Sequence, residues 1–362
     1  MIGSPKIKIS FEKLVRNAGK KAGTGVVLML LKDSADNGLH ILRSAEEIPS
    51  GLSEDNKKYI KQCFIGGSNE IRTGEYLERV ALTPSQVIVH VAGVEADLTK
   101  ELANLEDKEF NIFCMPGAQE LDIPKITAFI DKMNGAGVAC MAVVSSKSVN
   151  NANIINFKTN LTVAGESVTP DKYVARIAGI IAGVPLAQSV TYQVLDEVKA
   201  PTTDNSTADT AINKGELIVM NISGKPRIAR GVTSLVSEDE EEPFRKIKLK
   251  RIYNFINNSI RKVLVNEYLG KVPNTFDNKV LLCSAIKTGL LDEMVKEGLL
   301  AEGSLVDIDV NKQKAYLKQI GKNVDSMSDE EVRKANTNSR VFLKIHVSAI
   351  DAMEDFDIAI GI

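Results

Sequence analysis

An alternation of extended and helical segments between Gln86 and Ser145 constrains the fold more than any other feature of this sequence. The apolar runs VIVHVAG, FNIFCMPG and VACMAVVS are typical of buried strands. Between them, residues 97–105 and 122–134 have the pattern of helices. Strand, helix, strand, helix, strand implies a parallel sheet with right-handed crossover connections. The sequence therefore predicts an α/β domain.

Such a unit often binds a nucleotide outside the carboxyl ends of its strands, so a cytoplasmic α/β enzyme is the rival interpretation. The phosphate-binding glycine motifs GxGxxG and GxxxxGK[ST] do not occur in the sequence. The three histidines, His40, His90 and His346, are far apart and belong to no catalytic or metal-binding motif. We therefore expect no catalytic residue, no metal site and no cofactor.

Charge and cysteine usage narrow the class of protein. Lys plus Arg number 45 and Asp plus Glu 47, a net charge of -2 that argues against a broad nucleic-acid-binding surface. The four cysteines are widely spaced, which indicates neither a disulfide framework nor a metal site and fits a reducing cytoplasm. The longest apolar runs are shorter than the ~20 residues that span a bilayer. We expect a protein made in the cytoplasm, without a signal peptide or membrane insertion.

The second half of the chain predicts a further domain. Residues 173–182 have the composition of a buried helix, which Gly183 and Pro185 end. A polar stretch over 200–215 is expected to be an exposed loop, and Ser223-Gly224 to be the turn of a hairpin. After an acidic run at 238–242, an amphipathic helix, further helices and a short strand predict a C-terminal α+β domain.

Each end of the chain has the period of a strand without a partner in its own neighbourhood. PKIKISF near the N-terminus alternates apolar and polar residues, and the alternation returns after Asp355. A strand with an open edge is an aggregation hazard unless the protein uses it. We expect these ends to add strands to sheets of neighbouring subunits.

Several segments resemble the contractile tail sheath proteins of myophages and phage-tail-like bacteriocins. They are ARIAGIIAGVPLAQSVTYQVLDEV, INKGELIVMNISGKPRIARGVTSL, PFRKIKLKRIYNFINNSIRKVLVNEYLGKVPN and VFLKIHVSAIDAMEDFDIAI. They follow the order of the family and cover about the C-terminal half of the chain. The absence of a large inserted domain resembles the compact sheaths of phages and bacteriocins of Gram-positive bacteria.

The resemblance implies a structural subunit and not an enzyme. In that family, hexameric rings stack helically around an inner tube, and contraction drives the tube through a target cell envelope. The implied partners are further copies of the chain, the inner tail tube protein, and baseplate and tail terminator or collar proteins. The implied particle is a phage tail or a released tail-like bacteriocin, assembled in the bacterial cytoplasm. A contractile secretion-system sheath, usually built from two chains, is a third interpretation.

The resemblance also implies functional residues. Terminal arms link adjacent subunits in the family, and residues 13–24 and 351–355 would be their hinges. The implied linking-strand residues are Lys6, Ile7, Lys8, Ile9, Phe11, Phe356, Ile358, Ile360 and Ile362. Contact with the inner tube is expected to depend on charge, through Glu293 and Glu297 or through the acids at 329–331.

These expectations divide the chain into linking arms and domains. The predicted parts are an N-terminal linking arm (1–22), an N-terminal α+β subdomain (23–85), an α/β sheath domain (86–237), a C-terminal sheath domain (238–350) and a C-terminal linking arm (351–362).

Overall fold

The computed structural model describes residues 25–73, 76–201, 205–236 and 242–361. The chain divides into two compact units. The first, here called the α/β unit, comprises Gly23–Arg251 and Asp351–Ile362, and the second, the C-terminal unit, contains Ile252–Ile350. The last residues of the chain therefore return to the unit that holds its first described strand. The finer domain boundaries expected from the sequence stay a prediction.

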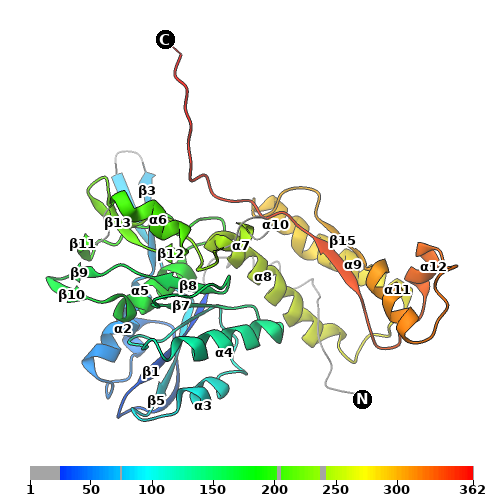
Figure 1. Cartoon of the computed structure of the whole chain (residues 1–362), viewed down its shortest axis with the longest axis horizontal. Coiled ribbons are helices and arrows are strands. Elements are labelled where there is room, and N and C mark those ends of the chain that lie inside the picture. The colour runs from blue at the N-terminus through cyan, green and yellow to red at the C-terminus, as the bar shows by residue number, and fades with distance from the viewer. Residues whose placement is uncertain (1–24, 74–75, 202–204, 237–241, 362) are drawn as a thin grey trace. The chain divides into compact units, whose positions relative to one another are not determined.

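A seven-stranded sheet forms the centre of the α/β unit (Figure 1). Its order is β12 (Glu216–Leu217), β8 (Ile154–Phe157), β7 (Met141–Val144), β6 (Ile112–Cys114), β1 (Val26–Lys32), β5 (Gln86–Ala92) and β2 (Gly38–Leu42). All neighbours pair in parallel except β2, which runs antiparallel to β5 at one edge. The predicted parallel-sheet α/β domain is confirmed.

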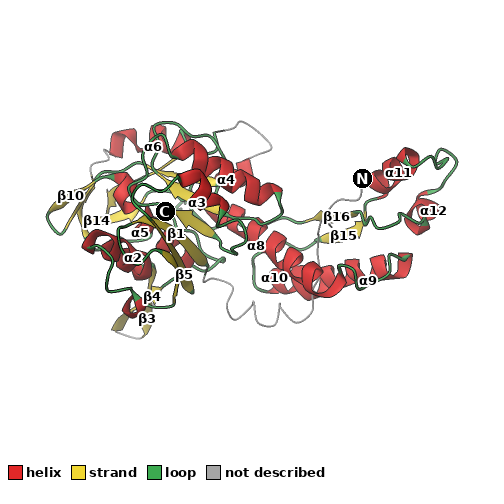
Figure 2. Ribbon diagram, turned by 90° about the horizontal axis from the view of Figure 1, so that it is seen from below, coloured by secondary structure: helices red, strands yellow, loops and turns green. Residues whose placement is uncertain are grey.

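Helices cover both faces of this sheet (Figure 2). Leu28 and Leu30 of β1 pack with α3 (Leu98–Ala103) and α4 (Ile123–Gly135) on one face. Val27 and Met29 pack on the other face with α2 (Glu54–Ile65) and α5 (Pro170–Gly183). Alternate residues of one strand thus enter two different cores, which explains why β1 is apolar at nearly every position.

α5 is the buried helix that the sequence predicts at 173–182, and every residue from Tyr173 to Gly183 is buried. Its one buried charge, Arg176, is 3 % exposed at the side chain and donates from Nε to Glu197 Oε1 at 2.6 Å. Arg176 also donates to the carbonyl oxygen of Gly66, at 2.5 Å. The Tyr173 hydroxyl donates to the same Glu197 carboxylate. A buried guanidinium is tolerated here because its partners are fixed around it.

Short strands and helices complete the α/β unit. The predicted hairpin at Ser223-Gly224 is confirmed as β13 (Val219–Ile222) and β14 (Lys225–Ile228). The prediction of a loop over 200–215 is wrong for the part that forms η2 (Asn205–Thr207) and α6 (Ala208–Asn213), because Ala208 is buried against Ile218 and Ala229. The other elements are η1 (Ala45–Glu47), β3 (Gly67–Thr73), β4 (Tyr76–Leu82), β9 (Leu161–Val163), β10 (Glu166–Val168), β11 (Val198–Pro201) and α7 (Glu242–Arg245).

The C-terminal unit is α+β, as the sequence predicts. α8 (Ile247–Val263) leads into it and continues as a π-helical segment, η3 (Leu264–Tyr268). A second long helix consists of α9 (Phe276–Ile286), η4 (Lys287–Leu291) and α10 (Asp292–Lys296). β15 (Leu305–Ile308) pairs antiparallel with β16 (Leu343–His346), with α11 (Val310–Gln319) and α12 (Asp329–Lys334) between them in the chain.

Close packing of α5 on α2 depends on a glycine. A Cβ at Gly179 would lie 2.0 Å from the carbonyl oxygen of Cys63, so Gly179→Ala must separate the two helices. We expect this change to lower the free energy of unfolding by about 1–3 kcal/mol or more, measured by urea denaturation. The matched control is Gly135→Ala at the end of α4, where a Cβ meets nothing within 4 Å. The control should be neutral or slightly stabilising, and equal stability of the two variants would contradict the packing argument.

Candidate assembly site

The last described residues form an exposed apolar segment that pairs with no strand in the described part of the chain. Residues 356–361 belong to no helix or strand, and Figure 1 shows them as a red trace that leaves the α/β unit. Phe356, Ile358 and Ile360 are 71, 74 and 85 % exposed. Because they alternate along the chain, their side chains would share one face if the segment became a strand. The other predicted linking-strand residues, Lys6, Ile7, Lys8, Ile9, Phe11 and Ile362, lie outside the described residues.

The segment just before this apolar stretch is attached to the α/β unit through three acids, Asp351, Glu354 and Asp355, here called the acidic latch. The Glu354 side chain is 6 % exposed. The hydroxyls of Ser189 and Thr191 donate to its Oε1 at 2.7 and 2.6 Å. Its Oε2 lies 3.5 Å from Lys246 Nζ and 3.6 Å from Arg230 Nε. Two partly buried hydroxyl donors and two cations thus hold one carboxylate.

The other two latch acids use the same cations. Arg230 donates from Nη2 to Asp355 Oδ1 at 2.5 Å, and Lys246 pairs with Asp351. The hydrogen bond from Arg230 lowers the pKa of Asp355, and the bond to Asp355 raises the pKa of Arg230. Asp355 is therefore ionised at neutral pH, and this pair is lost only as the pH falls below the usual carboxyl range.

The latch lies in one of the hinges that the family resemblance implies. That hinge, residues 351–355, stays a prediction, and the structure shows how the segment is held within its own subunit. In the structure the carboxylates of the segment are paired, although Met353 is 88 % exposed and the Asp355 side chain 80 % exposed. The exposed, unpartnered chain therefore begins at Phe356. The hinge predicted at 13–24 lies outside the described residues.

β15 and β16 in the C-terminal unit make a sheet that can accept further strands. Among the described residues, neither strand pairs with a third one, so both outer edges are open. Leu305 on β15 is 55 % exposed, and Lys344 and His346 on β16 point to solvent. Two-stranded sheets are marginally stable alone, and added strands would satisfy the open backbone groups.

The acids expected to face an inner tube have local roles. Glu293 pairs with Lys296 at 2.6 Å on α10. Glu297 caps the end of α10, and its partial burial, with Glu293 nearby, raises its pKa. In the second candidate set, Glu330 pairs with Lys334 at 2.5 Å, and Glu331 forms a capping box with Ser328. Glu297, in the first candidate set, is thus an acid whose charged form the described structure disfavours.

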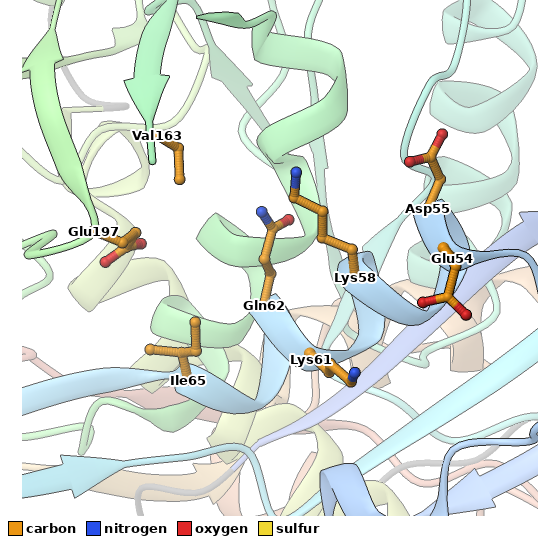
Figure 3. Close-up of a pocket in the computed structure, with 8 residues that line it drawn as sticks. All are labelled: Glu54, Asp55, Lys58, Lys61, Gln62, Ile65, Val163 and Glu197. Carbon is orange, nitrogen blue, oxygen red and sulfur yellow. The ribbon is translucent and has the colours of Figure 1, made fainter. Parts of the chain in front are cut away.

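One surface depression among the described residues does not resemble a catalytic centre. This depression, of about 380 Å³, lies beside α2 (Figure 3), where Lys58 and Gln62 face Val163 and Glu197 across the opening. Glu197 is already engaged by Arg176 and Tyr173. Among the described residues, no group of three His, Cys, Asp or Glu side chains could hold a metal ion. No helix within the described ranges is long and apolar enough to span a bilayer.

Comparison with known proteins gives consistent matches. Residues 92–234 match the family model of the phage tail sheath protein central domain, and residues 239–362 match that of the phage tail sheath C-terminal domain. A tail sheath protein of Clostridium phage phiCD119 is 38 % identical over 99 % of both chains. Protein XkdK of the phage-like element PBSX of Bacillus subtilis is 30 % identical over 48 % of this chain and 39 % of its own length.

Solved structures share the fold at low sequence identity. The sheath tail protein of Listeria innocua aligns with a TM-score of 0.65 at 15 % identity, over 92 % of this chain and 98 % of its own. The helical sheath of the anti-feeding prophage in its contracted state aligns with a TM-score of 0.68 at 14 % identity, over 100 % of this chain and 97 % of its own.

The four cysteines should be unreactive in the folded protein. All are buried and free, and burial raises the pKa of Cys63 and Cys140 to about 12 and that of Cys283 to about 11. Burial also raises the pKa of Cys114. Because the thiolate is the reactive form, we expect a soluble thiol reagent at pH 8 to react roughly 100-fold more slowly with the native protein than with the urea-unfolded chain. Rapid modification of a native thiol would contradict this.

Proposed function

This chain belongs to the phage tail sheath family, and on that premise we propose that its subunits stack as hexameric rings around an inner tube and contract to drive the tube through a target cell envelope. Members of the family are structural proteins, so the chain is a structural component of a tail particle and not an enzyme. The proposed partners are further copies of the chain, the inner tail tube protein, the baseplate and the tail terminator or collar. Assembly would take place in the bacterial cytoplasm.

The observation that supports this proposal is the exposed apolar segment that follows the latch. We propose that Phe356, Ile358, Ile360 and Ile362 form a strand on the open β15–β16 sheet of a neighbouring subunit. Lys6, Ile7, Lys8, Ile9 and Phe11 would do the same for a second neighbour. Donor and acceptor surfaces differ, so the contact is head-to-tail, and such contacts close into rings or propagate as helices.

The energetics of one arm fit a lattice better than a dimer. Burying each large apolar side chain contributes about 1.5–3 kcal/mol, whereas ordering each residue costs about 1–2 kcal/mol of backbone entropy. Only alternate residues are buried, so the two contributions nearly cancel. Backbone hydrogen bonds and the high effective concentration within an array would then favour assembly.

Contraction needs no nucleotide in this proposal. The extended sheath would be a kinetically trapped state, and new lateral contacts between subunits would release free energy as it contracts. Each subunit would move as a rigid body. The strands that link it to its neighbours would stay paired, so large displacements would need no unfolding. The fold is compatible with a contracted array, because the contracted anti-feeding prophage sheath has it.

The arm proposal is tested by electron microscopy of the full chain and of versions that lack residues 1–13 or 356–362. We expect ringed tubes from the full chain and discrete subunits from both truncations, since each truncation removes one linking strand. The matched control is Leu121→Ser, which removes another aliphatic side chain that is 85 % exposed but lies outside the arm. Tubes formed by the chain without residues 356–362 would refute strand exchange through this arm.

Glu293 and Glu297 are the proposed contacts with the inner tube, because an incoming cation would relieve the unfavourable charge at Glu297. Exposed ion pairs contribute about 0.2–1 kcal/mol each, so Glu293→Gln with Glu297→Gln should weaken tube binding roughly 2- to 30-fold per subunit. Co-sedimentation of tube protein with sheath at increasing salt measures this. The control is Asp329→Asn with Glu330→Gln, which spares the capping box. If only the Asp329→Asn, Glu330→Gln variant lost binding to the tube protein, the contact would belong to α12 and not to Glu293 and Glu297.

A further inference from the structure

The acidic latch brings together all the segments that carry the family resemblance. Ser189 and Thr191 follow α5, Arg230 follows β14, and Lys246 precedes α8. Each contacts Glu354, which lies 165 residues from Ser189 in the chain. A contact between such distant segments, close to the start of the proposed linking arm, calls for a functional explanation.

We infer that the acidic latch fixes the point at which the C-terminal arm leaves its own subunit, and thereby selects the neighbouring copy whose sheet the arm can reach. This inference rests on the strand exchange proposed above. Glu354, Arg230 and Lys246 are then positioning residues for assembly, and the arm proper begins at Phe356.

The receiving surface of the latch is held rigidly by the backbone. Thr191 Oγ1 accepts a hydrogen bond from Gly231 N at 2.9 Å, next to Arg230. Ile247 N donates to Gly231 O at 3.0 Å, and Val232 forms a β-bridge with Lys246. Val190 and Ile247 are each 1 % exposed. The hydroxyls and cations therefore have defined positions before the carboxylates arrive, which reduces the entropy lost when the latch closes.

The latch is a network and not a set of independent surface pairs. Arg230 contacts Glu354 and Asp355, and Lys246 contacts Asp351 and Glu354. Glu354 is shared by both cations and is almost completely buried at its side chain. Charge-assisted hydrogen bonds in such a place are stronger and less screened than those of exposed pairs.

Closing the latch limits the reach of the arm. An extended chain spans at most about 3.3–3.6 Å per residue. With the latch closed, the free segment starts at Phe356, so its end lies within roughly 25 Å of Asp355. Opening the latch adds residues 351–355 to the tether, or about 17 Å more. A closed latch thus restricts the arm to sheets within this shorter reach, whereas an open latch also permits pairing with sheets farther away.

Spin labelling of the full chain tests whether the latch controls the arm. A nitroxide on Met353→Cys is selective because the native cysteines are buried. We expect slow label motion with the latch intact and a rise of roughly 10-fold or more in the ratio of mobile to immobile label in Glu354→Ala. Glu354→Gln, which still accepts from the hydroxyls, should be intermediate, and Lys246→Met should also release the label.

The matched control for label motion is Asp357→Asn, which removes a carboxylate from the same segment but outside the latch. It should leave label motion unchanged. Equal mobility in Glu354→Ala and Asp357→Asn would overturn the latch itself. Unchanged circular dichroism and urea midpoint of the α/β unit show that each variant is folded.

Assembly of the same full-length latch variants tests the selection of a neighbour. We expect Glu354→Ala and Lys246→Met to retain subunit association but to lose regular ring spacing, with at least about a 10-fold fall in the fraction of ordered tubes. Leu121→Ser, the control outside both the latch and the arm, should form ordered tubes. Ordered tubes from Glu354→Ala, when removal of residues 356–362 abolishes assembly, would overturn the inference and leave strand exchange intact. Tubes formed by the chain without residues 356–362 would instead refute strand exchange, whatever the mobility of the spin label.

Discussion

Burial of α5 is the constraint on which the rest of the α/β unit depends. The helix packs on the sheet with one side and approaches α2 so closely at Gly179 that no side chain fits between them. Its single buried charge, Arg176, joins the carbonyl of Gly66 to Glu197, and so ties together chain segments on either side of the helix. Because the Arg176 side chain is 3 % exposed and its partners belong to the same unit, this network is structural.

The same helix determines where the proposed assembly surface lies. The chain leaves α5 at Val184 and reaches Ser189 and Thr191 within a few residues, and Arg251 fixes this exit by donating to the Val184 carbonyl at 2.6 Å. The hydroxyls that bind Glu354 are therefore positioned by core packing and not by a flexible loop. The start of the proposed C-terminal arm is therefore held by the rigid sheet. A loosely tethered strand would have no such fixed starting point.

Sequence periodicity was sufficient for elements whose patterns are strong. The strands β5, β6 and β7 of the parallel sheet, the buried α5 and the β13–β14 hairpin follow from apolar spacing and turn residues. The β3–β4 hairpin was missed because its strands carry Glu70, Arg79 and other polar residues, which give no apolar run. The latch was missed for a different reason. The sequence would allow the three latch acids to pair with any of the 45 Lys and Arg residues of the chain. Only the tertiary fold selects Arg230 and Lys246.

The charges near the two ends favour pairing with a different surface over pairing of like arms. In the sequence, Asp355 and Asp357 flank Phe356, whereas Lys6 and Lys8 flank Ile7. Two C-terminal arms side by side would bring like charges together, which destabilises a strand pair. The exposed Lys344 on β16 would instead attract an acidic strand. Charge thus disfavours self-pairing of arms, which would give closed dimers, and it is compatible with the proposed head-to-tail contact of a helical sheath.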